Sequence, residues 1–221
     1  MIMDGRISNE KQIASIERYT VTRGAGRGLD VIDCSNGRLR FKINVTKACD
    51  IMQAWYEGTN LSFISKNGFT LRETPFAKRF EGGMLYTCGL DSVGNRRGFE
   101  THGSLHNTPA EIVCAECDES GITVQAVIRD TELFGKNLVL KRTITSGIGE
   151  NSITVCDRLV NSGCREEDYC LLYHVNVGYP MLDAGCRIVA DVQDFVARTP
   201  WAEKMQSGIY EIGESVSGQE E

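Results

Sequence analysis

Three histidines are the side chains of this 221-residue chain best suited to proton transfer. His102 and His106 lie in residues 100–109, where Gly and Pro predict an irregular loop. His174 lies in residues 169–180, the most apolar strand-like run. An imidazole with an ordinary pKa near ~6.5 both gives and takes a proton at neutral pH, which suits general acid–base catalysis. A histidine in an apolar strand is also compatible with a satisfied core residue, and this alternative stays open for His174.

The same residues allow two other chemistries. Three histidine ligands would make the protein a metal-dependent isomerase. The spacing of His102 and His106 lacks the helix and glutamate of a zincin motif, however, and no close His-x-His pair occurs. Cys88 with His102 would make a nucleophile–base pair, but nothing in the sequence brings the two together. We therefore expect no metal and no cofactor.

The nine cysteines do not form a recognisable framework. Cys114 and Cys117 have the spacing of zinc ligands, but a zinc site needs a second pair, and Cys164 and Cys170 are too widely spaced to supply it. An odd, scattered set indicates reduced thiols rather than disulfides.

A glycine-rich segment, residues 24–28, is similar in composition to a phosphate-binding loop. Such a loop leads from a strand into a helix. Residues 29–34 instead predict a strand. The segment is therefore expected to be a turn.

Four longer segments carry a resemblance to a known family: Gly82–Gly94, His102–Val113, Leu133–Ile144 and Leu172–Asp183. They resemble the aldose 1-epimerase (galactose mutarotase-like) superfamily. The resemblance is greatest to the branch labelled "aldose 1-epimerase family protein", and it extends over nearly the whole chain. It implies an all-β fold, an antiparallel β-supersandwich with a sugar-binding cleft across one sheet.

The resemblance also implies an activity and a site. In mutarotases one histidine protonates the ring oxygen and a glutamate takes the proton of the anomeric hydroxyl, so that the ring opens and recloses on the other anomer. The motifs place His174 as the acid and His102 as its partner, and both steps are proton transfers that need no cofactor. The expected substrate is a monosaccharide or a sugar derivative. The residues expected to bind its hydroxyls are Asn176, Asp91, His106, Asn107 and Arg79. The aromatic residues that could stack on a sugar ring or pack in the core are Trp55, Tyr86 and Tyr179.

The general base cannot be carried over to this chain. In the family it is a glutamate well downstream of the second histidine, and Glu211 and Glu214 lie in a different sequence context. We therefore expect residues 1–221 to form a single domain that corresponds to the N-terminal portion of the family domain. A non-catalytic sugar-binding protein or subunit is the alternative function. Self-association or a partner chain would then cover exposed strand edges.

Period-two patterns define the elements that must position these residues. Alternating apolar and polar residues predict strands at 38–45, 122–128, 137–144 and 152–160. Turns rich in Gly and Asn separate them and predict two hairpins, 111–117 with 122–129 and 137–145 with 151–160. Strands at this spacing favour a large antiparallel sandwich.

Both ends of the chain differ from this pattern. Ile13 and Ile16 lie three residues apart and predict one short helix over Asn9–Tyr19. The polar residues 214–221 are expected to form a frayed tail.

Composition and charge narrow the function classes. The chain has 24 basic and 30 acidic side chains, a formal net charge of −6, which argues against a nucleic-acid partner. No apolar run approaches the ~18 residues of a membrane span, so we expect no membrane partner. The first ten residues lack the apolar core of a signal peptide, and a cytoplasmic location is expected.

Overall fold

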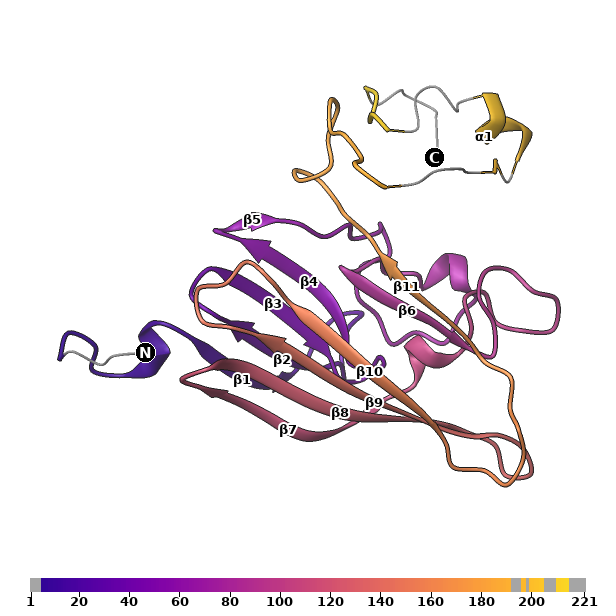
Figure 1. Ribbon diagram of the computed structural model, residues 1–221, viewed down its shortest axis with the longest axis horizontal. Coiled ribbons are helices and arrows are strands. Elements are labelled where there is room, and N and C mark those ends of the chain that lie inside the picture. Colours follow the sequence, from indigo (N-terminus) through magenta and orange to yellow (C-terminus); the bar gives the residue numbers. More distant parts are fainter. Residues whose placement is uncertain (1–4, 192–195, 198, 205–209, 215–221) are drawn as a thin grey trace.

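The computed structural model describes residues 5–191, 196–197, 199–204 and 210–214. Two larger antiparallel sheets lie face to face, and a short two-stranded sheet lies beside them (Figure 1). The described helices are short: three 3₁₀ turns, η1 (Glu10–Gln12), η2 (Phe76–Lys78) and η3 (Leu105–Asn107), and one α-helix, α1 (Pro200–Lys204). The fold is therefore an antiparallel β-sandwich, which confirms the expected fold class.

The first sheet has five strands in the order β1-β2-β3-β4-β5. Its strands are β1 (Ser15–Thr20), β2 (Asp30–Ser35), β3 (Leu39–Asn44), β4 (Asp50–Tyr56) and β5 (Thr59–Asn60). The second sheet has four strands in the order β10-β9-β8-β7. Its strands are β7 (Ala110–Asp118), β8 (Gly121–Thr131), β9 (Asn137–Ser146) and β10 (Thr154–Asn161). Every strand in these two sheets pairs with its neighbour in the chain, so the connections within each sheet are local.

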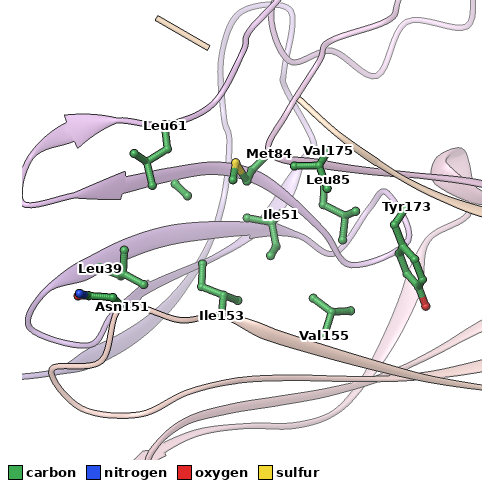
Figure 2. Close-up of a pocket in the computed structure, with 11 residues that line it drawn as sticks. Leu39, Ile51, Leu61, Met84, Leu85, Asn151, Ile153, Val155, Tyr173 and Val175 are labelled. Carbon is green, nitrogen blue, oxygen red and sulfur yellow. The ribbon is translucent and has the colours of Figure 1, made fainter. Parts of the chain in front are cut away.

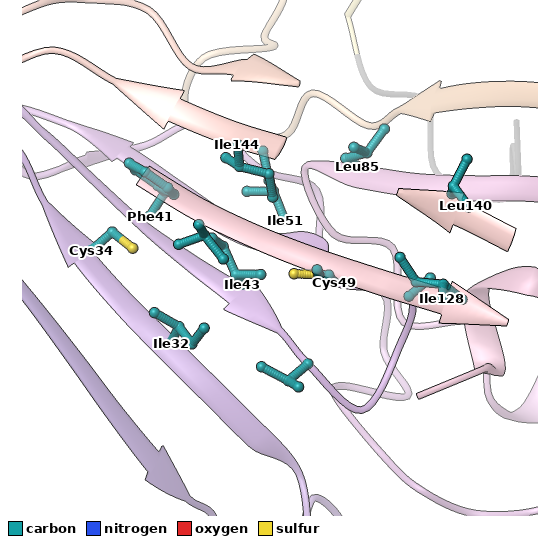
Figure 3. Packing of buried hydrophobic residues seen from close by; sticks show 14 of the residues in the cluster. Ile32, Cys34, Phe41, Ile43, Cys49, Ile51, Leu85, Ile128, Leu140 and Ile144 are labelled. Atoms are coloured by element: carbon teal, nitrogen blue, oxygen red, sulfur yellow. The ribbon is translucent and has the colours of Figure 1, made fainter. Parts of the chain in front are cut away.

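The core lies between these two sheets. Because side chains alternate across a strand, each strand contributes every second residue to the interior. Phe41 and Ile43 of β3 and Ile128 of β8 are completely buried, and they pack with Leu140 and Ile144 of β9 (Figure 3). The alternation read from the sequence therefore identified the faces of these strands correctly.

The third sheet pairs β6 (Leu85–Leu90) with β11 (Cys170–Val175), two strands far apart in the chain. The loop between β6 and β7, residues 91–109, carries His102 and ends in η3. After β11 the chain leads away from the sheets (Figure 1). Of the tail expected at 214–221, residues 215–221 lie outside the described part.

The predicted helix over Asn9–Tyr19 is wrong. Only Glu10–Gln12 form a 3₁₀ turn, capped by Asn9, and Ser15–Thr20 form strand β1. Strand β1 pairs along its whole length with β2, with Ile16 opposite Cys34. These sheet contacts outweigh the weak helical spacing of two isoleucines, because β-branched and aromatic residues fit a half-buried sheet well.

The other local predictions are confirmed. Both hairpins form, with β7 paired to β8 and β9 paired to β10. The glycine-rich segment 24–28 is a turn that leads into β2. Among the described residues no helix is long and apolar enough to cross a membrane.

Candidate active site

Strand pairing places His174 beside an aromatic residue. In the register of β6 with β11, His174 lies directly opposite Tyr86. Tyr86 is buried and His174 is partly exposed. The sequence left open whether His174 is an enclosed core residue, and its partial exposure leaves the imidazole accessible.

A strained loop brings His102 to the same place. His102 has a positive φ of 66°, which is uncommon for any residue other than glycine. Its carbonyl accepts a hydrogen bond from the Gly89 N–H, and its own N–H donates to the Gly94 carbonyl. Gly103 follows with φ +80°, and a Cβ there would lie 2.6 Å from the Ser92 carbonyl oxygen. Glycine is thus required at position 103, because only a residue without a Cβ fits against this loop.

The two imidazoles form a pair. The ring centroids of His102 and His174 lie 5.5 Å apart, with the planes nearly perpendicular at 80°. Three aromatic rings surround them: Phe76 lies 5.2 Å from His102, Phe80 lies 6.3 Å from His174, and Tyr86 lies 6.2 Å from His102. We call these five side chains the histidine–aromatic cluster. The proximity expected from the two motifs is present, while the roles of the histidines stay predictions.

Hydrogen bonding determines which ring nitrogen of His102 carries the proton. The Gly94 N–H donates to Nδ1 of His102 at 3.3 Å, so that nitrogen is the acceptor and Nε2 carries the proton of the neutral ring. Burial and the neighbouring His174 both lower the pKa of His102. His102 is therefore neutral at physiological pH and presents an N–H donor.

His106 lies in a different environment from the other two histidines. It is 2% exposed, and its ring stacks on Tyr86 with a centroid separation of 3.7 Å. Nδ1 lies 2.6 Å from a carboxylate oxygen of Asp50, and Nε2 lies 3.4 Å from one of Glu81. The expected role in binding sugar hydroxyls does not suit this placement, since both ring nitrogens already face carboxylates. The ring partner of His106 is Tyr86, whereas His102 and His174 are ring partners of each other, which disfavours a three-histidine metal site.

Opposing effects determine the pKa of each group around His106. Burial alone would lower the pKa of His106, but the hydrogen bond to Asp50 and the contact with Glu81 outweigh burial and raise it. Burial alone would raise the pKa of Asp50, but Arg142, His106 and Thr87 together lower it. The pKa of Glu81 is likewise lowered, by His106 and Lys47 against burial. These shifts favour the charged form of all three groups.

Two of the predicted sugar-binding residues hold the backbone. The side-chain amide of Asn176 donates to the carbonyl oxygens of Gly83 (3.0 Å) and His174 (3.3 Å). Asp91 accepts hydrogen bonds from the backbone N–H and the hydroxyl of Ser104, both at 3.1 Å. These contacts fix the end of β11 and the loop that carries His102.

Arg79 and Asn107 lie together at a polar cavity. Arg79 forms an ion pair with Glu100, whose carboxylate also accepts a hydrogen bond from the Asn107 side chain at 3.2 Å. The cavity has a volume of about 450 Å³, and Arg79, Asn107 and Lys47 line it. Arg79 follows η2, the 3₁₀ turn whose Phe76 contacts His102, so this cavity adjoins the segment that flanks the histidine pair.

A second cavity is mostly apolar. It has a volume of about 360 Å³ and lies where β4, β6, β10 and β11 come together (Figure 2). Side chains such as Ile51, Leu85, Val155 and Val175 line it. A sugar needs hydrogen-bond partners for its hydroxyls. This cavity is therefore a poor candidate for the sugar site.

The remaining sequence candidates have no evident chemistry. Cys88 is fully buried, and burial raises the pKa of its thiol to about 12, so it is no thiolate nucleophile at neutral pH. Trp55 lies on the five-stranded sheet with the cations of Arg40 and Lys42 near its ring. Within the described ranges no group of three or more His, Cys, Asp or Glu residues is arranged to hold a metal ion.

Comparison with known proteins identifies the family. A family model described as "Domain of unknown function (DUF4432)" matches residues 26–221. The chain belongs to the DUF4432 family. No match to the chain was found among curated proteins.

Solved structures show what this DUF4432 chain is similar to. A "putative aldose 1-epimerase" from Klebsiella pneumoniae aligns with a TM-score of 0.77 and 19% identity, over 90% of this chain and 57% of that one. A "putative mutarotase" from Salmonella typhimurium aligns with a TM-score of 0.46 and 16% identity, over 64% of this chain and 45% of that one. The first likeness shows that the DUF4432 chain has an aldose 1-epimerase-like fold. The chain spans 57% of the length of that structure.

Proposed function

We propose that this DUF4432 chain binds a monosaccharide at the histidine–aromatic cluster, and that His174 and His102 act on the same sugar ring as acid and positioning donor. The observation that carries the proposal is the perpendicular pair of imidazoles 5.5 Å apart. A sugar ring is of a size to touch both. Phe76 and Phe80 flank the pair and supply apolar ring faces of the kind that sugars stack on.

The protonation of His102 supports this division of roles. Its neutral ring donates from Nε2, which suits a hydrogen bond to a sugar oxygen. In this scheme His174 protonates the ring oxygen and the anomeric C–O bond to that oxygen breaks. The proton of the anomeric hydroxyl must then leave to a base, so the ring opens to the free aldehyde.

The candidate bases are already engaged. Asp91 accepts two hydrogen bonds from Ser104, and Glu100 pairs with Arg79 and Asn107. Glu211 lies beyond β11, in an isolated bridge with Arg187. Loss of one proton-transfer partner typically lowers the rate ~10²–10⁴-fold, and the spontaneous reaction in water is a competing background. We therefore expect this chain to bind sugar and to accelerate mutarotation weakly or not at all.

Non-catalytic sugar binding is the second candidate function. The engagement of Asp91 and Glu100 favours it, since binding requires the histidine pair and the aromatic rings but no base. A sugar-dependent rise in melting temperature with no rate gain over the spontaneous reaction would identify this case.

Polarimetry on freshly dissolved α-anomers tests both functions. The panel is galactose, glucose and their uronates, with the chain, His174→Ala, and Arg158→Gln on the exposed side of β10 as the matched control. Acceleration that His174→Ala abolishes and Arg158→Gln retains supports catalysis. Melting shifts measured with the same sugars report binding. If no sugar shifts the melting temperature and none mutarotates faster, the proposed function is wrong.

A further inference from the structure

Six charged side chains form a buried cluster beneath the β6–β11 pair. They come from six different strands, turns and loops, and each side chain is 5% exposed or less: Lys47, Asp50, Glu81, His106, Arg142 and Asp157. We call them the buried charge cluster. Charges without water around them are stable only when they are paired and hydrogen-bonded.

The contacts within the buried charge cluster alternate in sign. Lys47 Nζ lies 2.9 Å from Glu81, and Glu81 lies 3.4 Å from Nε2 of His106. Nδ1 of His106 lies 2.6 Å from Asp50, and Asp50 lies 2.5 Å from Arg142. Arg142 then holds Asp157 through two hydrogen bonds of 2.9 and 2.8 Å. His106 is the link between the Lys47 end and the Arg142 end.

The charge count determines the state of His106. Three carboxylates face only two permanent cations, Lys47 and Arg142, so a neutral His106 would leave the buried charge cluster with one unbalanced negative charge. A neutral imidazole also donates from only one nitrogen, whereas both nitrogens of His106 face a carboxylate. An imidazolium satisfies both conditions. The raised pKa of His106 agrees with this state.

One face of the His106 imidazole is covered by Tyr86. The two rings are stacked with an interplanar angle of 16°, an arrangement in which a cation is attracted to the ring face. The groups that face His106 are thus Asp50 of β4, Glu81 before β6 and Tyr86 of β6, with Lys47 and Arg142 behind the carboxylates.

The buried charge cluster also reaches β11. The Tyr173 hydroxyl donates to Asp157 at 2.9 Å, and Tyr173 is the neighbour of His174 in the strand. Thr87, directly opposite Tyr173, donates to Asp50 from its backbone N–H at 2.7 Å. The cluster therefore contacts both strands on which the histidine–aromatic cluster is built.

We propose that His106 is an imidazolium at neutral pH that completes a balanced buried charge cluster and positions Tyr86 beneath the His102–His174 pair. His106 is then a positioning residue that does not touch the sugar. The charge state of His106 does not depend on the proposed function. Its effect on sugar binding does rest on the proposed function.

Nuclear magnetic resonance of ¹⁵N-histidine-labelled protein tests the charge state directly. The chain has only 3 histidines, and His102→Gln and His174→Gln variants assign two of the signals. At about pH 7.5, above the ordinary pKa of ~6.5, both ring nitrogens of His106 should carry protons, and His102 should show one protonated nitrogen. A His106 ring with a single protonated nitrogen at that pH overturns the proposal.

A double-mutant cycle at His106 and Glu81 tests whether the buried charge cluster needs a balanced charge. His106→Gln removes the positive charge and should lower the melting temperature, because it leaves one excess carboxylate buried. Adding Glu81→Gln restores the balance, so the double variant should recover part of that loss. A purely steric role for His106 predicts additive losses, and additivity would contradict the proposal. If His106→Gln does not fold, Glu81→Gln alone remains informative, because it should lower the imidazole pKa measured by the same resonances.

Measurements of sugar binding test whether His106 positions Tyr86 for the candidate site. For whichever sugar shifts the melting temperature of the wild-type chain, the Glu81→Gln/His106→Gln variant should bind about 10- to 100-fold more weakly, since small displacements of a supporting group have effects of this size. Arg158→Gln serves as the control and should bind normally. Wild-type affinity in the folded double variant would contradict the positioning role. A wild-type chain that binds no sugar would refute the proposed function and leave the resonance test decisive for the charge state.

Discussion

Tyr86 and His174 face each other across the β6–β11 pair, in directly opposed positions of the register. The face of Tyr86 stacks on buried His106, and its ring makes T-shaped contacts with Phe76 and His102. One ring thus contacts both the buried imidazole of His106 and the accessible imidazole of His102. A change at Tyr86 should therefore affect both the stability of the fold and the geometry of the candidate site.

Two substitutions of Tyr86 should distinguish the contribution of its ring to stability from that of its hydroxyl. Tyr86→Phe keeps the stacked ring and should leave the free energy of unfolding within about 1 kcal/mol of wild type. Tyr86→Leu removes the ring contacts and leaves unfilled volume, and it should cost about 2–4 kcal/mol. Urea unfolding followed by circular dichroism measures both. Equal losses for the two variants would show that the hydroxyl, rather than the ring, is the important group.

Gly103 should be the least replaceable glycine near the site. Gly103→Ala combines φ +80° with a Cβ 2.6 Å from the Ser92 carbonyl, so the loop must move and His102 with it. We expect a loss of more than about 3 kcal/mol in unfolding free energy and a loss of sugar binding. Gly149→Ala is the matched control: its φ is +72°, but a Cβ there meets nothing within 4 Å.

Gly149→Ala should cost only the ~1–2 kcal/mol of the left-handed backbone conformation. Similar losses at Gly103 and Gly149 would mean that the conformation alone, and not the close approach to Ser92, makes Gly103 necessary.

Arg142 should be essential for stability in a way that a surface arginine is not. Arg142→Met removes the guanidinium that pairs with both Asp50 and Asp157 in the interior, and removal of one partner from a buried pair costs about 3–5 kcal/mol. Arg40 also pairs with an aspartate, Asp33, but its side chain is 57% exposed. Arg40→Gln should change the unfolding free energy by less than about 1 kcal/mol. Thermal unfolding of both variants checks this. Equal shifts in melting temperature would contradict the importance of burying the Arg142 ion pairs.

The alternating patterns were sufficient to predict most of the fold. Four strand runs and two hairpins appear close to the positions read from the sequence, because one face of each strand is buried and the register is fixed by that face. The pairing of β6 with β11 could not be read in the same way. It joins strands about 80 residues apart, and no turn signal reports a contact at that separation.

The site was predicted in part. The motifs around His102 and His174 led to the two accessible histidines. The sugar-hydroxyl-binding role predicted for His106 does not suit its burial between Asp50 and Glu81. One signal for the buried charges was present in the sequence. Arg142 falls on the apolar face of its strand, in period two with Leu140 and Ile144, and a charge at such a position predicts a buried partner.

The pH dependence of the unfolding free energy should report the protonation of His106. Its pKa is raised in the folded state, so protonation of the folded chain persists above the unfolded pKa of ~6.5. The resulting stability is fully present below about pH 6.5 and is lost as the pH rises through the folded pKa, with a slope of about 1.4 kcal/mol per pH unit between the two values. The pKa of His102 is lowered instead, so its contribution rises with pH and is complete near the same pH.

Above about pH 6.5 the contribution of His102 to stability no longer changes with pH, so only the contribution of His106 does. Below about pH 8 titration of the buried thiols does not yet affect stability. Unfolding free energies between these limits should therefore fall with pH for the wild-type chain and stay level for His106→Gln. The control His102→Gln should keep the downward slope, because it leaves the buried charge cluster intact. A wild-type curve that is flat or rises over this interval would mean that His106 is neutral in the folded chain, and that the buried charge cluster carries one negative charge that Lys47 and Arg142 do not balance.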